Sequence, residues 1–403
     1  MTEPAARDAV PTGQVAILLA AGIGYFAVAG ISFPVLPRLV EQEIGGTESA
    51  IGVAFGSLAL GMLAVRPFVG YLSDRYGRRP TMVAGALVIA ALQLLHVPAA
   101  ETGLWALVAV RVAMGMAASL MYVSQATVAT ELAPASRRGT VFATFSTAVF
   151  IGFAIGPVLG EWLLEERGFT ATFAVAAGLG VFCALAASVL PETRPDGIEP
   201  RFDGLRSLFH PIAARIGVMN LLVFMTFIGF NGFITPYAES MGVTSVRWIL
   251  LTYSGTTLVM RAVGGRLLDQ ANRMHLATAA FAVVAVGTTI LALAPSVAWL
   301  YVGAFVTAVG LAYNVPLLVL IGADSADDED RARVVSTITT FGDLANSAGA
   351  LALGFVAAAS GYTVMYLAIT AGALGALVLL HSPFMAPVAG LHTDRPDRTP
   401  VTS

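Results

Sequence analysis

The stretch RPFVGYLSDRYGR, residues 66–78, recurs in altered form as RAVGGRLLDQANR, residues 261–273. Five positions are identical at a constant offset of 195 residues, which is too regular to be explained by chance. The chain is therefore expected to contain two repeated halves. The identical residues are Arg66, Gly70, Leu72, Asp74 and Arg78 in the first copy, and Arg261, Gly265, Leu267, Asp269 and Arg273 in the second.

The composition is that of a membrane protein. Of the 403 residues 57% are hydrophobic and only 12% are charged, whereas soluble domains carry about 25% charged residues. The net charge of −3 excludes a large basic surface for nucleic acid. The single cysteine, Cys183, excludes disulfides and cysteine-based metal sites, and the five histidines show no ligand spacing, so no metal is expected.

A membrane-spanning helix needs about 20 mostly apolar residues. The polar central residues 192–212, which contain three prolines, divide the apolar segments into two sets of six. We therefore expect an all-α polytopic membrane protein of 12 transmembrane helices, with a tail at 1–13, a six-helix bundle at 14–191, a second bundle at 213–382 and a tail at 383–403. The first span is expected to be retained in the mature protein. The twelve segments are 14–37, 48–70, 80–98, 103–132, 138–163, 171–191, 213–238, 244–268, 276–294, 297–322, 332–358 and 360–382.

The distribution of arginine predicts the orientation. Odd-numbered connections hold three arginines, Arg38, Arg167 and Arg247, whereas even-numbered connections and the tails hold sixteen. Basic residues are enriched in cytoplasmic loops, so both termini and the central loop are expected to be cytoplasmic. The chain contains arginine but no lysine, and it is rich in Ala and Gly. We therefore expect a bacterial protein of the cytoplasmic membrane.

The segment from Gly70 to Arg79 resembles the signature loop between helices 2 and 3 of the major facilitator superfamily. The resemblance covers about residues 14–382 and implies a major facilitator fold, usually monomeric, with substrate bound between the halves. In the family this loop is a cytoplasmic gate, and the alternative is a simple topology anchor. The gate residues implied are Gly70, Asp74, Arg75, Gly77, Arg78, Arg79, Asp269 and Arg273.

Helix 5 is similar to the motif of the drug:proton antiporter branch. Gly152, Gly156, Pro157 and Gly160 match that pattern, and Glu161 stands where a second glycine is usual. The matching segment of helix 11, offset by 193 residues, begins at Gly349 and has no proline. The resemblance implies antiport, while a packing seam of small residues remains the alternative.

Two ionisable residues are predicted inside the membrane. Asp343 lies about eleven residues into the segment 332–358, near the bilayer centre, where such residues are usually functional. We expect Asp343 to couple proton movement, with Arg111 of helix 4 as its partner or modulator. The alternatives are a permanently paired or neutral Asp343, and an Arg111 that extends to the interface.

The expected substrate cavity is mostly apolar and aromatic, with a few hydrogen-bonding groups, which suits amphipathic molecules. Helix 1 has no acid between Val15 and Pro37, which argues against strongly cationic substrates. An acidic loop at 324–331 is either simply solvated or forms an ionic latch with the arginines of the gate. The expected cavity residues are Tyr25, Ser32, Tyr122, Gln125, Phe227, Asn231, Asn314 and Asn346.

The sequence has no phosphate-binding glycine loop and no grouping of nucleophile and base, so we expect neither an ATP-driven pump nor an enzyme. No cofactor is expected, because a proton gradient would supply the energy. The favoured function is proton-coupled efflux of small drugs or natural products, with protons, small-molecule substrate and membrane lipids as partners and no nucleic acid. The alternatives are an exporter or importer of a polar metabolite such as a sugar or siderophore, and a non-transporting receptor on the same scaffold.

Overall fold

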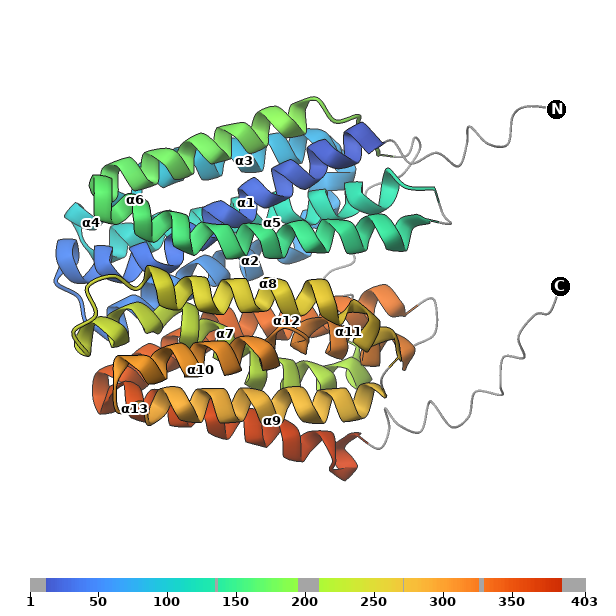
Figure 1. Ribbon diagram of the computed structural model, residues 1–403. Helices are drawn as coiled ribbons and strands as arrows, with labels where there is room; N and C mark the ends of the chain where they lie inside the picture. The colour runs from blue at the N-terminus through green and yellow to red at the C-terminus, as the bar shows by residue number, and fades with distance from the viewer. Residues whose placement is uncertain (1–11, 135–136, 195–209, 271, 326–329, 386–403) are drawn as a thin grey trace, which may run out of the picture.

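The computed structural model describes residues 12–134, 137–194, 210–270, 272–325 and 330–385. This part of the chain forms helices and short connections, without a strand (Figure 1). Most of the two tails and most of the central loop, whose bounds were expected at 1–13, 383–403 and 192–212, lie outside the described residues.

The N-terminal half forms one bundle. Its apolar runs are long enough to form helices, and glycines end or interrupt them, as at Gly77 and Gly103, whose φ angles are 102° and 128°. Its elements are α1 (Thr12–Leu39), the π-helical turn η1 (Val40–Ile44), α2 (Glu48–Tyr76), α3 (Arg78–Leu94), α4 (His96–Thr102), α5 (Leu104–Glu131) and α6 (Arg138–Ser188).

The C-terminal half repeats this plan with more interruptions. The expected helix 10 divides at Ala312 and Tyr313, because Pro316 lacks the N–H that would continue the helical hydrogen bonds. The elements are α7 (Pro211–Ser240), α8 (Arg247–Gln270), α9 (Arg273–Ala292), α10 (Val297–Leu311), α11 (Asn314–Asp324), α12 (Arg331–Leu344), η4 (Ala345–Gly349), α13 (Ala350–Leu380) and η5 (Pro383–Met385).

Two of these helices are long enough to cross a membrane twice. Within the described residues, eight helices are sufficiently long and apolar for a span, or nine when α3 and α4, bent by 48°, are counted as one. Both α6 and α13 contain a glycine with positive φ, Gly168 at 74° and Gly361 at 80°, where the chain turns back. With α8, whose arginines lower its hydropathy, the arrangement is consistent with the expected twelve crossings.

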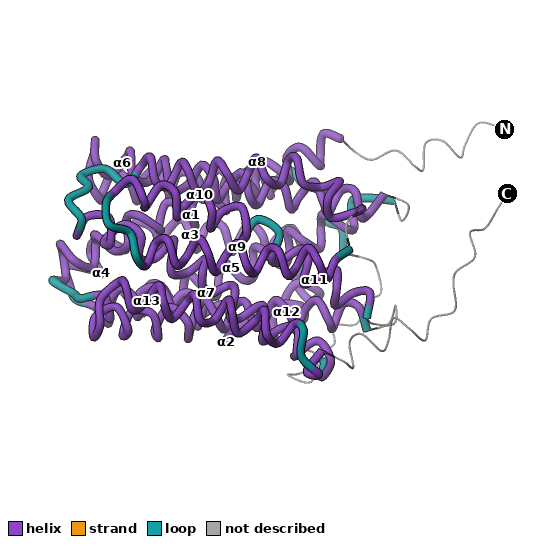
Figure 2. The backbone as a smooth tube through the Cα atoms, turned by 60° about the horizontal axis from the view of Figure 1, so that its bottom comes forward, coloured by secondary structure: helices purple, strands orange, loops and turns teal. Residues whose placement is uncertain are grey.

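The two halves lie side by side with their helices running lengthwise, the blue-to-green half beside the yellow-to-red half (Figure 1). In Figure 2 the helices again run along one long axis. The described chain begins at Thr12 and ends at Met385 at the same end of the bundle (Figure 1). We call this the terminal end and the opposite one the distal end.

The halves meet through small residues near the distal end. A Cβ atom on Gly52 of α2 would lie 2.6 Å from the carbonyl oxygen of Ala350 and 3.0 Å from Cα of Gly354, both on α13. Only glycine therefore allows the two backbones to approach so closely. This contact joins the first half to the second.

Candidate transport site and its gates

The predicted proton-coupling residue forms an ion pair between the halves. Arg66 of α2 pairs with Asp343 of α12, and it also donates a hydrogen bond of 2.6 Å to the hydroxyl of Thr339. The side chain of Arg66 is 20% exposed and that of Asp343 is 16% exposed, so both are largely but not completely removed from solvent. A charged pair in this position can separate or re-form as the halves move.

Arg111, which the sequence suggested as the partner of Asp343, has a different environment. It is buried in the N-terminal half, where Nε donates to the carbonyl of Ala54 at 3.1 Å and the guanidinium lies 5.9 Å from the centre of the Phe55 ring. Its Nη1 has no hydrogen-bond partner among the described residues. In this conformation Asp343 therefore pairs with Arg66 and not with Arg111, and the alternative that Arg111 is a modulator of Asp343 stays a prediction.

A second arginine reaches across the halves without an acidic partner among the described residues. The guanidinium of Arg261 in α8 lies 3.2 Å from the ring centre of Phe150 in α6. The phenol groups of Tyr253 and Tyr313 are close enough to interact with it electrostatically. This contact was not predicted, although the repeat that relates Arg66 to Arg261 contained the signal.

Aromatic side chains fill the interface between the halves. Phe33 of α1 stacks on Phe153 of α6 at 5.8 Å between ring centres, and both contact Phe227 of α7 edge-on, at 5.6 and 5.7 Å. Phe227 was expected in the cavity, and this cluster places it at the junction of the halves. Asn231, one turn further, donates to the carbonyl of Phe227 at 2.9 Å.

The other expected cavity residues are divided between the two bundles. Tyr25 donates to the carbonyl of Ala118 at 3.3 Å, and Tyr122 contacts the Phe26 ring from α5. Ser32 and Gln125 are buried with polar atoms that have no partner within the described chain. In the second half Asn314 is buried beside Asn220, to which it donates at 3.5 Å, and Asn346 is half-buried in η4.

An ionic cluster joins the two halves near the distal end. Arg38 of α1 donates from Nη2 to Glu161 of α6 at 2.9 Å and from Nε to Glu239 of α7 at 2.5 Å. Glu161 is fully buried and also accepts the backbone N–H of Val246 at 2.9 Å. The cluster therefore connects both halves. Sequence reasoning noticed Glu161 only as a departure from the motif of helix 5.

The helix 5 motif itself packs against helix 1. Added Cβ atoms on Gly152, Gly156 and Gly160 would lie 2.6, 2.5 and 2.7 Å from backbone oxygens of α1, and a Cβ on Gly30 would lie 2.8 Å from Cδ of Pro157. These contacts are those of a tight packing seam, the alternative that the sequence left open. The seam holds α1 and α6 in the positions that bring Arg38 to Glu161.

At the terminal end the signature loop is braced within its own half. Arg78 pairs with Asp74 and, at 3.2 Å, with Glu131 of α5, while Gly77 adopts a φ of 102° to make the turn. The backbone N–H groups of Arg78 and Arg79 donate to Glu192 at 2.8 and 3.2 Å. The loop is thus a compact, hydrogen-bonded structure.

Among the described residues, the remaining gate side chains make polar contacts within their own half. Arg75 donates to the hydroxyl of Tyr71, and a Cβ on Gly70 would meet nothing within 4 Å. Arg273 pairs with Asp324 in the second half. The side chain of Asp269 lies outside the described residues, as do residues 326–329 of the acidic loop. The latch between that loop and Arg75, Arg78 and Arg79 stays a prediction.

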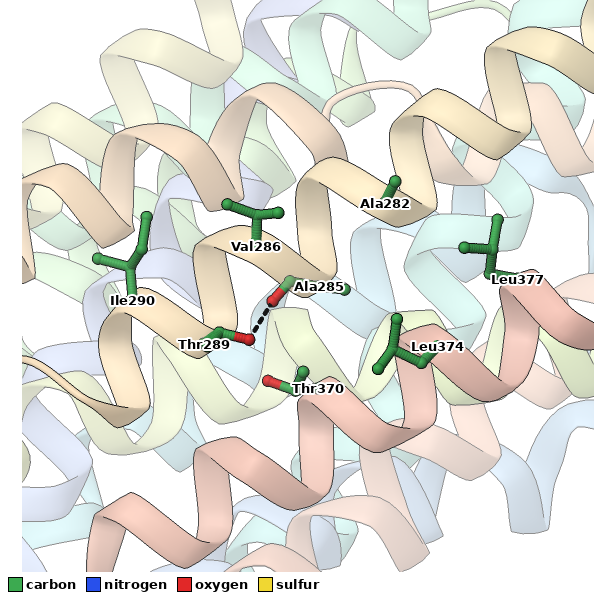
Figure 3. A pocket seen from close by; sticks show the side chains of 8 residues that line it. All are labelled: Ala282, Ala285, Val286, Thr289, Ile290, Thr370, Leu374 and Leu377. Atoms are coloured by element: carbon green, nitrogen blue, oxygen red, sulfur yellow. Dashed lines mark hydrogen bonds between the residues drawn. The ribbon is translucent and has the colours of Figure 1, made fainter.

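An open groove of about 360 Å³ lies between α9 and α13, on the second half alone (Figure 3). Its lining is almost wholly apolar, and the hydroxyl of Thr289 is satisfied by the carbonyl of Ala285 at 2.7 Å. None of the expected site residues lines it. The groove therefore suits the hydrocarbon chains of lipids better than a transported molecule.

Comparison with known proteins agrees with this architecture. The family model of the Major Facilitator Superfamily matches residues 17–244 and 216–402. The chain is 23% identical over 360 residues to an uncharacterized MFS-type transporter of Methanocaldococcus jannaschii, covering 86% of this chain and 90% of that one. It is 29% identical over 203 residues to the multidrug resistance protein MdtL of Klebsiella pneumoniae, a match that covers 48% of this chain and 50% of the relative.

A mutant of the nucleoside transporter NupG has the same fold. The TM-score is 0.76 with 13% sequence identity, and the match covers 93% of this chain and 99% of that structure. At this identity the likeness concerns the arrangement of helices alone.

Proposed function

Since this chain belongs to the Major Facilitator Superfamily, and is therefore a transporter and not an enzyme, we propose that it exports small amphipathic molecules in exchange for protons. It does so by alternating access between the two halves, as a monomer in the bacterial cytoplasmic membrane. Protons and the exported molecule are its partners, lipids surround it, and the gradient replaces any cofactor.

The ion pair between Arg66 and Asp343 carries this proposal. It connects α2 to α12 across the interface, so its strength affects the equilibrium between conformations. Burial and nearby charge decide whether a carboxyl group carries a proton. When Asp343 is protonated it loses its attraction for Arg66, and the two halves separate at this point. Proton binding is thereby linked to the movement of the halves.

The closed distal end supports an inward-facing conformation. With the terminal end in the cytoplasm, as the arginine distribution predicts, the cluster of Arg38, Glu161 and Glu239 seals the outer side. Outward opening requires this cluster to break. Export then follows if substrate enters from the cytoplasm and the cluster opens after it.

Two observations favour efflux of amphipathic molecules over the alternative of a polar metabolite. The multidrug resistance protein MdtL is among the relatives, although it is matched over half its length. Phe33, Phe153 and Phe227 form an aromatic junction with few hydrogen-bonding groups, whereas a sugar site would need many. The nucleoside transporter that shares the fold is too distant in sequence to favour a polar substrate.

Asp343→Asn is expected to abolish proton movement driven by substrate, because asparagine cannot release or accept the coupled proton. Wild type and variant are placed in energised inside-out vesicles, and internal pH is followed with a dye. Lipophilic cations, neutral antibiotics, aromatic anions and sugars are added in turn. For wild type one class dissipates the gradient, and for the variant the response falls by at least about a hundredfold, the lower end of what proton transfer by a positioned side chain typically contributes.

Arg333→Gln removes a charge from the exposed start of α12 and serves as the matched control. It should retain the proton response, since Arg333 lies ten residues before Asp343 on the sequence. A variant at Asp343 that moves protons as wild type does would contradict the coupling role. Folded protein that moves no proton with any class would contradict proton antiport itself.

A further inference from the structure

The two halves differ in the residue that faces the repeated arginine. The repeat relates α2 to α8 by 195 residues and the helix 5 segment to the helix 11 segment by 193, so Phe150 occupies the position equivalent to Asp343. The structure repeats the contact as well, since Arg66 contacts Asp343 and Arg261 contacts Phe150. One arginine therefore faces a carboxylate, and its counterpart faces an aromatic ring.

The substitution of Phe for Asp leaves a charge without compensation. Arg261 is half-buried between α8 and α6, and its Nε has no hydrogen-bond partner within the described chain. The groups that interact with it within the described chain are the Phe150 ring and the phenols of Tyr253 and Tyr313, none of which is a carboxylate. An aromatic face attracts a guanidinium, but less strongly than a desolvated carboxylate does.

We propose that Arg261 is a binding residue for the transported molecule and that this molecule is an aromatic monoanion, in which a carboxylate accompanies an apolar ring system. The inference deepens the proposed transport function and rests on it. The carboxylate of the substrate pairs with Arg261. Arg261 then has an ion-pair partner, as its counterpart Arg66 has in Asp343. The ring system packs on Phe150 and on the aromatic residues at the junction of the halves.

The chemistry of the pathway fits this class of substrate. Asp343 is committed to Arg66, so a cationic substrate would meet Arg261 without a free carboxylate nearby among the described residues. A neutral substrate would leave Arg261 desolvated and uncompensated, which is unfavourable. An anion satisfies it, and guanidinium binds carboxylate through two parallel hydrogen bonds. Because Arg261 lies on α8 and Phe150 on α6, an anion bound to both residues would contact both halves.

The test measures binding without a gradient, in nanodiscs of phosphatidylcholine, whose headgroup has no net charge. Equilibrium dialysis compares 2-naphthoate with 2-naphthamide, its neutral counterpart of nearly equal size. Wild type should bind 2-naphthoate at least about tenfold more tightly than 2-naphthamide, as expected for a charge-assisted contact. Arg261→Gln should reduce this ratio to about one, and Arg261→Lys should keep part of it.

Phe150→Asp provides a second variant, which retains Arg261 but installs the carboxylate found at the equivalent position. It should also reduce the ratio to about one, because the guanidinium is then already paired. Arg167→Gln removes one exposed arginine beside the turn of α6 at Gly168 and is the control that should keep the wild-type ratio. Thermal unfolding of each variant confirms that the protein is folded.

Equal affinity of wild type for the acid and the amide would overturn the inference, and so would a preference for the acid that survives in folded Arg261→Gln. Since no proton gradient is used, these results are independent of the vesicle experiment with Asp343→Asn. Proton antiport with a different substrate class would leave the proposed function intact while this inference fails.

Discussion

Glu161→Ala is expected to open the distal end of the protein. Glu161 accepts from Arg38 and from the backbone of Val246, and all of these groups are buried. Removing one member of a buried ion pair leaves the other charge uncompensated and costs about 3–5 kcal/mol. The cost falls on the closed conformation, because outward opening would return Arg38 to water. A loss of about 3 kcal/mol changes the ratio of closed to open protein by roughly a hundredfold.

The change is measured by cysteine labelling. Thr235 lies one turn inside Glu239 on α7 and is fully buried. In a Cys183→Ser background, Thr235→Cys should be protected from a membrane-impermeant maleimide added outside intact cells. Adding Glu161→Ala should make it reactive. Equal labelling with and without Glu161→Ala would show that the cluster does not close the pathway.

A double substitution separates charge from packing. Arg38→Met with Glu161→Met removes the buried pair and fills the same space, while Glu239, whose side chain is 31% exposed, can be solvated. Such replacements of buried pairs are often neutral or stabilising. The double variant should therefore be protected again, like wild type. If it labels as strongly as Glu161→Ala, the hydrogen bond to Val246, and not the ion pair, holds the end closed.

Gly52→Leu and Gly61→Leu, two substitutions in α2, are expected to have different consequences. At Gly52 the added side chain would meet Ala350 and Gly354 of the other half. At Gly61 it would meet the backbone oxygen of Val112, 2.1 Å from the new Cβ, within the same half. Overpacking against backbone costs about 3 kcal/mol or more. The first variant can escape by opening between the halves, whereas the second can escape only by losing its fold.

Thermal unfolding and transport distinguish these outcomes. Gly52→Leu should unfold within a few degrees of wild type, lose at least about nine-tenths of its transport, and expose Thr235→Cys to the maleimide. Gly61→Leu should yield little folded protein. If Gly52→Leu transports normally, then the contact between α2 and α13 is not part of the transport cycle.

The architecture could be predicted from the sequence because membrane spans and repeats are visible in short stretches of it. Twelve apolar runs, the polar break after residue 191 and the repeated arginines gave the two bundles without reference to any contact. Asp343 could be identified in the same way, because an acidic residue near the centre of an apolar run is unusual. These features depend on hydropathy and spacing, which a single chain displays.

The partners of the charged residues could not be predicted in the same way. The sequence suggested Arg111 for Asp343, but the structure gives Arg66, which had been noticed only as part of the repeat. A pairing between α2 and α12 depends on how two bundles dock, and 277 positions separate these residues along the chain. Glu161 was missed for the same reason, because its partners come from the other half as well as its own.

Duplicated halves give a transporter two copies of every internal position, and the copies are free to diverge. Here the arginine is retained in both copies, while its opposite residue is an acid in one and a phenylalanine in the other. One substitution at either position changes the charge of the pathway by a whole unit and leaves Arg38 and the signature loop unaltered. Proton coupling at one copy and substrate selectivity at the other can therefore evolve separately on an otherwise unaltered scaffold.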